Sequence, residues 1–138
     1  MKAISVQKTF LAQLESRHYL GLFLLRLFLG LRLLYGVLDN VLHWERMLEF
    51  AVFLENNDFP LPLISAVVSV YIQLFGAISL LVGYKLRFFS ILLILNFIVA
   101  LVFVHLANND TIEGMTPALA ILFGCLALFF TQSRENFN

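Results

Sequence analysis

Charged residues are scarce in this 138-residue chain, where Asp, Glu, Lys and Arg together make up 13% of the sequence. Soluble globular domains carry about 25% charged residues and about 45–50% apolar residues, whereas this chain is 61% hydrophobic. Lys and Arg balance Asp and Glu, and no basic cluster offers a track for phosphate groups, which excludes nucleic acid as a partner. The scarcity of charge therefore predicts an integral membrane protein.

Cysteine occurs once, at Cys125, and this excludes an intrachain disulfide and any redox mechanism that uses two thiols of this chain. The apolar sequence around Cys125 predicts a small, inert packing residue. No metal site is predicted, because His43 and His105 have no well-placed third ligand. Residues 1–20 lack the continuous apolar segment and the cleavage site of a signal peptide, so we expect the first span to serve as the insertion signal.

Long apolar runs predict an all-α fold, namely a membrane-spanning four-helix bundle that forms a single domain over residues 1–138. Each run reaches the length of about 20 residues that a helix needs to cross the hydrocarbon layer. The expected spans are residues 19–42, 61–82, 86–106 and 112–131. Such a protein has the lipid bilayer as its first partner.

Two segments outside the spans also show helical spacing. Residues 44–55 alternate apolar positions with charged ones such as Glu45 and Glu49, which predicts an amphipathic helix at the outer membrane interface, between spans one and two. Residues 2–18 favour either a short surface helix or a frayed tail, and the sequence does not decide between the two.

Basic residues alternate sides along the chain as four spans require. They precede the first span, separate the second span from the third, and follow the fourth. They are Lys2, Lys8, Arg17, Lys85, Arg87 and Arg134. The other two connections are acidic and contain only Arg46 as a basic residue. This pattern predicts a multi-pass protein of the cell (inner) membrane with both termini in the cytoplasm.

Two arginines interrupt the first span, which reads YLGLFLLRLFLGLRLLYGVLDNVLHW over residues 19–44. An ionisable side chain at this depth costs about 2.5–3.5 kcal/mol, so it is expected to face other helices or water. One interpretation is a cavity inside the bundle where Arg26 and Arg32 bind a quinone head group or a small oxyanion. In the structural alternative, Arg32 pairs with Asp39 and Arg26 extends toward the cytoplasmic face.

Four more polar residues are candidates for the lining of this cavity. Asp39 and His43, four positions apart, form either a proton relay or an interfacial cap. Gln73 and Asn96 lie in the middle of spans two and three, where they either hydrogen-bond between helices or line the cavity. At about 100° per residue, His105 falls on nearly the opposite face from Asn96, so we expect it at the interface.

Several short motifs resemble those of the DoxX family of small four-helix membrane proteins. They are LLRLFLGLRLLYGVLDNVLHW in span one, FLENNDFPLPLISAVVSVYIQLFGAISLLVGYKLRFFSILL across spans two and three, and VFVHL at the end of span three. The resemblance covers residues 20–130 and implies an inner-membrane protein linked to redox chemistry, as in a subunit of a thiosulfate:quinone oxidoreductase. The chain departs from the family pattern at Gln73, where many members have Glu, and after Gly36, where a basic residue is common.

Three functions agree with these features, and the sequence leaves open whether the chain is an enzyme. The first is a redox-associated membrane subunit that binds a quinone without a covalent bond and exchanges electrons with a protein partner, because the chain has no haem-ligand pair and no flavin-binding fold. The second is a non-catalytic binding or assembly protein. The third is a small-solute transporter, which with four spans would require a homo-oligomer. The amide at Gln73 favours binding over proton-coupled chemistry.

Overall fold

The computed structural model describes residues 17–132. Its elements are α2 (His18–Leu42), α3 (Trp44–Glu55), α4 (Pro62–Val82), α5 (Leu86–Ala100), the π-helical segment η1 (Leu101–Leu106) and α6 (Ile112–Thr131). The four helices long and apolar enough to cross a membrane are α2, α4, α5 together with η1, and α6, and their ends lie within one residue of the predicted spans. The predicted all-α architecture is confirmed over this range. The segment considered for residues 2–18 lies almost entirely outside the described residues.

The ends of the helices follow from local sequence signals. α4 begins at Pro62, which has no N–H group to leave unpaired in the first turn. It ends at Gly83, whose φ of 85° is a left-handed conformation that favours glycine, and whose N–H donates to the carbonyl of Ser79 at 2.8 Å. α6 begins after Thr111, whose hydroxyl accepts a hydrogen bond from the N–H of Gly114 at 3.2 Å.

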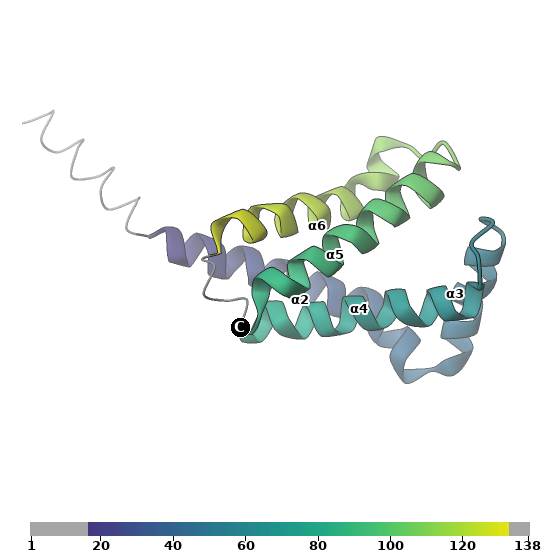
Figure 1. Cartoon of the computed structure of the whole chain (residues 1–138), viewed down its shortest axis with the longest axis horizontal. Coiled ribbons are helices and arrows are strands. Elements are labelled where there is room, and N and C mark those ends of the chain that lie inside the picture. Colours follow the sequence, from purple (N-terminus) through teal and green to yellow (C-terminus); the bar gives the residue numbers. More distant parts are fainter. Residues whose placement is uncertain (1–16, 133–138) are drawn as a thin grey trace, which may run out of the picture.

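One core cluster joins all four spans over the half of the bundle where α2 begins and α6 ends (Figure 1). Glycines permit close approach of the helices there. A Cβ atom added at Gly30 would lie 2.8 Å from the Leu81 side chain, and one added at Gly124 would lie 2.6 Å from Leu29. This half of the bundle is therefore packed without room for larger residues at these positions.

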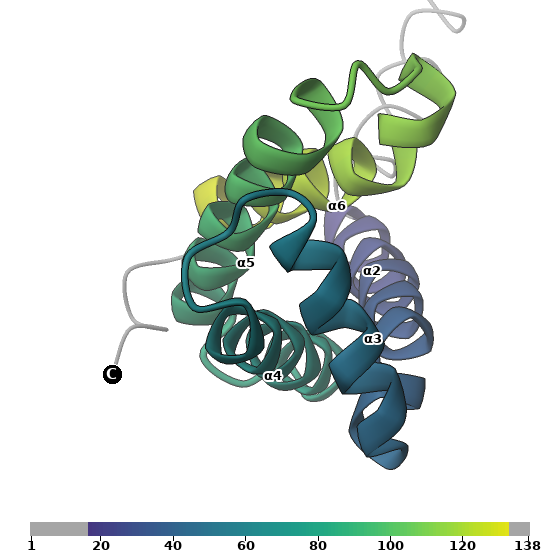
Figure 2. The same cartoon turned by 90° about the vertical axis from the view of Figure 1, so that its right-hand side faces the viewer.

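A second core cluster, at the other end of the bundle, joins only α2, α3 and α4. Its buried members are Val37, Met47, Ala51, Leu54, Ala66 and Val70. α3 packs its apolar face here and leaves Glu45, Glu49 and Glu55 exposed. The pair formed by α5 and α6 diverges from α2 and α4 toward this end (Figures 1 and 2). Because α5 and α6 take no part in the second core, the space between the two helix pairs is not filled by a common core.

Candidate functional site

A cavity of about 400 Å³ lies between the two helix pairs, and we call it the arginine cavity. Its polar lining side chains are Arg32, Asn40, Gln73 and His105. Apolar side chains complete the wall, among them Phe50, Val70, Phe97 and Ile121. No carboxylate is among the lining residues, so the cavity carries a positive charge at Arg32 without a compensating negative one.

Arg32 reaches this cavity because Gly36, one turn later on α2, has no side chain to obstruct it. A Cβ atom added at Gly36 would lie 3.2 Å from Nη1 of Arg32. The Arg32 side chain is partly buried and makes no hydrogen bond or ion pair with any residue between 17 and 132. The pair with Asp39 that the sequence allowed is not formed. Asp39 instead forms an ion pair with Arg46, whose Nε lies 3.2 Å from Asp39 Oδ2.

Arg26 lies outside the cavity and has a structural partner. Its Nε donates to the carbonyl of Leu80, in the last turn of α4, at 2.9 Å. Its guanidinium also covers Gly83, where a Cβ atom would lie 2.5 Å from Nη2. A cation at the carboxyl end of a helix is stabilised by the helix dipole and satisfies a carbonyl that lacks a helical partner. The structure therefore does not bring Arg26 and Arg32 into one cavity.

Asp39 and His43 lie on the surface near the start of α3, at neither cavity described here. His43 Nε2 is 3.8 Å from Asp39 Oδ1, and the two side chains are 65% and 61% exposed. Arg46 Nη1 donates to Glu49 at 2.8 Å, and this hydrogen bond, with the charges of Glu49 and Asp39, raises the pKa of Arg46. Exposed ion pairs of this kind contribute little to stability.

A second cavity of about 510 Å³ has a mostly apolar lining, and we call it the apolar cavity. The two cavities share the lining residues Phe50, Gln73, Phe97 and His105. Gln73 donates from Nε2 to the hydroxyl of Ser69 at 3.2 Å, within α4. Asn96 lines the apolar cavity, is partly buried, and has no hydrogen-bond partner among the described residues. The interhelical bond between Gln73 and Asn96 is therefore not formed.

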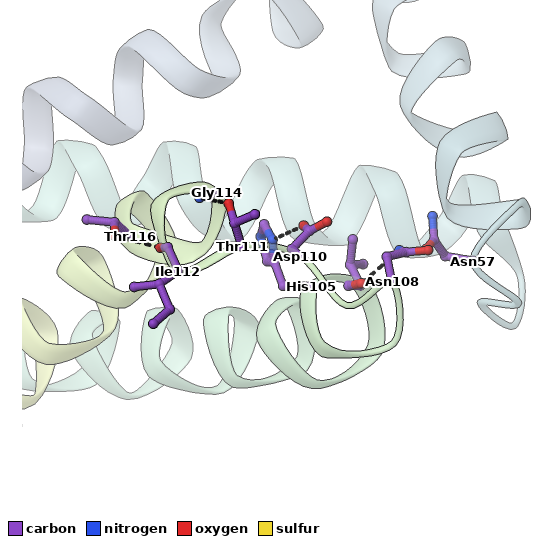
Figure 3. A network of polar contacts seen from close by, with 9 residues as sticks. Asn57, His105, Asn108, Asp110, Thr111, Ile112, Gly114 and Thr116 are labelled. Atoms are coloured by element: carbon purple, nitrogen blue, oxygen red, sulfur yellow. Dashed lines mark hydrogen bonds and ion pairs between the residues drawn. The ribbon is translucent and has the colours of Figure 1, made fainter.

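His105 lines both cavities, so the expectation that it and Asn96 face opposite directions is wrong. Residues Leu101–Leu106 form a π-helix, whose wider turns rotate less per residue than an α-helix and bring His105 round toward the cavities. His105 Nδ1 lies 2.7 Å from Asp110 Oδ2 (Figure 3), and His105 is 23% exposed. π-Helical turns are rare and often mark functional sites.

The pair of His105 with Asp110 is the part of the site that sequence reasoning missed. Asp110 stands in a loop after the third span, and Asn109 adopts a left-handed conformation, with φ of 51°, that turns the chain back. The backbone N–H of Asp110 then donates to the carbonyl of His105 at 3.0 Å. The asparagine-rich turn signalled a loop, but neither helical periodicity nor residue spacing indicates a π-helix.

A side-chain hydrogen bond joins the loop after α3 to the loop after η1. Asn108, after η1, donates to the side-chain oxygen of Asn57, after α3 (Figure 3). Each asparagine is also anchored on its own helix end, Asn57 to the Phe53 carbonyl at 2.8 Å and Asn108 to that of Val104 at 2.7 Å. These contacts tie the two helix pairs together where no common core does so.

The comparisons with known proteins give a family for this fold. A family model described as DoxX matches residues 21–106, which include α2, α3, α4, α5 and η1. No protein of curated function and no solved structure matches the chain significantly. Within residues 17–132 there is no group of three His, Cys, Asp or Glu side chains that could hold a metal ion. The family match and the four apolar helices together show that the chain is a multi-pass membrane protein of the DoxX family.

Proposed function

We propose that this protein is a redox-associated membrane subunit whose arginine cavity binds the head group of a quinone or a small oxyanion. The observation that carries the proposal is the Arg32 guanidinium, which lines the cavity without a partner among the described residues. A charged group within a span costs about 2.5–3.5 kcal/mol and usually pairs with an acceptor. A bound ligand with acceptor oxygen atoms supplies the partner that the protein does not.

The chemistry of the cavity wall fits such a ligand. Guanidinium is always charged and presents its N–H groups as a planar fork to oxygen acceptors. The rings of Phe50 and Phe97 provide apolar surfaces against which a flat ring can pack. A bound quinone supplies the electron- and proton-transfer chemistry, while the residues of this chain bind and orient it. Electrons then pass to or from a protein partner.

Gln73 supports a second function, that of a non-catalytic binding or assembly protein. It lines both cavities at a position where a carboxylate would be able to accept a proton from a ligand. An amide does not titrate, so a proton-coupled transporter has less support from this cavity. The same binding cavity would then hold a ligand for structural reasons, without turnover.

The bilayer topology that we propose places α3 in the outer membrane interface and the loop between α4 and α5 in the cytoplasm, with both termini. Glu55, at the end of α3, and Tyr84, in the loop, are exposed, and the native Cys125 is fully buried. In intact cells, Glu55→Cys should react with a membrane-impermeant maleimide, whereas Tyr84→Cys should react only after permeabilisation. The reverse pattern would contradict the orientation.

Native mass spectrometry in mild detergent tests whether the cavity holds a ligand. The expected spectrum contains a species heavier than the bare chain by the mass of one quinone, which is released on collisional activation and identified by fragmentation. A complex that contains a second protein in fixed ratio and no small molecule would favour the assembly function. A bare chain that also fails to bind added quinone would contradict the proposed redox role.

A further inference from the structure

The apolar cavity adjoins the arginine cavity and is lined mainly by residues of α4 and α5. The two share Phe50, Gln73, Phe97 and His105 as lining residues, so they meet at these side chains. Val68 of α4 and Leu95 and Val99 of α5 line the apolar cavity, and each is more than two-fifths exposed on the outer surface of its span. Because these surfaces face acyl chains in a bilayer, the apolar cavity is accessible from lipid.

Aromatic rings line one end of the apolar cavity. Phe53 and Phe59 line it, and the ring of Phe59 contacts that of Phe103 edge to face, with centroids 6.0 Å apart. The hydrogen-bonded asparagines Asn57 and Asn108 lie in the loops next to these rings. Aromatic rings and two anchored loops therefore flank one end of the apolar cavity, which Asp110 also lines.

Two polar side chains in the cavity linings make no hydrogen bond with the described residues, and they lie in different cavities. They are Arg32 in the arginine cavity and Asn96 in the apolar cavity. The other polar side chains that line the cavities have partners. For example, Gln73 donates to Ser69, and His105 pairs with Asp110. A ligand that extends from one cavity into the other can contact both donors, whereas a small anion at Arg32 would leave Asn96 without a partner.

We propose that the ligand is an amphiphile with a long apolar chain: its head group lies at Arg32 and its chain extends through the apolar cavity to the bilayer between α4 and α5. This inference rests on the proposed function and decides between its two ligand classes, in favour of a chain-bearing quinone over a free small oxyanion. The volumes of about 400 and 510 Å³ both fall within the range of about 300–1,000 Å³ typical of ligand sites.

Binding of two probes to the purified protein separates the two cavities. The probes are a chain-free benzoquinone and the same ring with a decyl chain, each titrated in the same detergent. Ala100→Phe places a ring in the apolar cavity, which Ala100 lines, whereas Ala120→Phe adds the same ring on the exposed face of α6 as a control. The smaller Ala100→Leu replaces Ala100→Phe if that variant does not purify as a single species.

The unchanged protein and Ala120→Phe should bind the decyl probe about tenfold more tightly than the chain-free ring, because the chain adds buried apolar area. Ala100→Phe should lose that preference while binding the chain-free ring as before. If Ala100→Phe prefers the decyl probe as strongly as the unchanged protein does, the apolar cavity does not hold the chain. That result would leave the head-group site at Arg32 in place. Decyl binding that depends on Ala100 but not on Arg32 would also overturn the proposal, because the apolar cavity would then bind an alkyl chain without a head group at Arg32.

The failure of the proposed function itself has a different signature. Binding of the chain-free ring, with no chain to enter the apolar cavity, reports only on the head-group site. If Arg32→Leu and the unchanged protein bind that ring equally, the proposed function is wrong, whatever Ala100→Phe does. The two probes and the two variants therefore assign each outcome to one cavity.

Discussion

Replacing Arg32 by leucine is expected to weaken binding of a chain-free quinone at least about tenfold and to leave thermal stability unchanged or slightly higher. A hydrogen bond that involves a charged group contributes about 1.5–3 kcal/mol, and each 1.4 kcal/mol corresponds to a factor of ten in affinity. Arg32 has no partner among the described residues, so its removal leaves no protein group unsatisfied. Titration of the ring and thermal unfolding of the same preparation measure both effects.

Arg26→Leu is the matched control, because it removes the same group from the same helix. In this variant the Leu80 carbonyl loses its donor, so the free energy of unfolding should fall by about 1–3 kcal/mol while quinone affinity stays the same. Arg32→Lys should bind quinone with an affinity between those of the leucine variant and the unchanged protein, since an ammonium keeps the charge but not the planar fork. If Arg32→Leu loses stability but still binds quinone, this arginine stabilises the helix bundle and does not bind a ligand.

Replacing Gly76 by leucine is expected to destabilise the bundle severely and to disrupt both cavities. A Cβ atom at Gly76 would lie 2.8 Å from Cγ and both Cδ atoms of Leu93, whose side chain is completely buried. Overpacking of this kind costs about 1–3 kcal/mol, and here it forces α4 away from α5. Because Gln73 and Phe97 lie one turn beyond this contact, the shared cavity wall would also separate.

Gly21→Leu provides the control for this substitution. Gly21 is also helical, but a Cβ atom there would meet nothing within 4 Å, so leucine should be tolerated and should strengthen the helix through its higher helix propensity. The measurement is thermal unfolding in detergent, together with the fraction of protein that elutes as a single species. Similar stability of the two variants would show that α4 and α5 are not held in close contact at this point.

The spans were predictable because each is a long apolar run bounded by a proline, a glycine or a polar turn, as at Pro62 and Gly83. The same local logic predicted the helix over residues 44–55 between the first two spans, and its place at the outer membrane interface stays a prediction. These features depend on neighbouring residues within one element, which a sequence displays directly.

The partners of the polar side chains were not predictable in the same way. Asp39 lies on the same helix as Arg32, yet it pairs with Arg46 because α2 ends at Leu42 and α3 folds back beside it. His105 turns into the cavities because the chain adopts a π-helix at Leu101–Leu106, and Asp110 meets it because of a left-handed turn at Asn109. Each outcome depends on how two elements meet, and residue spacing along one element carries no information about that.

By itself, the amino-acid sequence determined that this chain forms four apolar helices with two arginines in the first, because hydrophobicity and helical period are properties of single segments. The tertiary structure alone decided that one arginine caps α4 while the other faces a cavity without a partner. The reason is the second core, which includes α3 but excludes α5 and α6, so that the helix pairs diverge and leave Arg32 beside unfilled space.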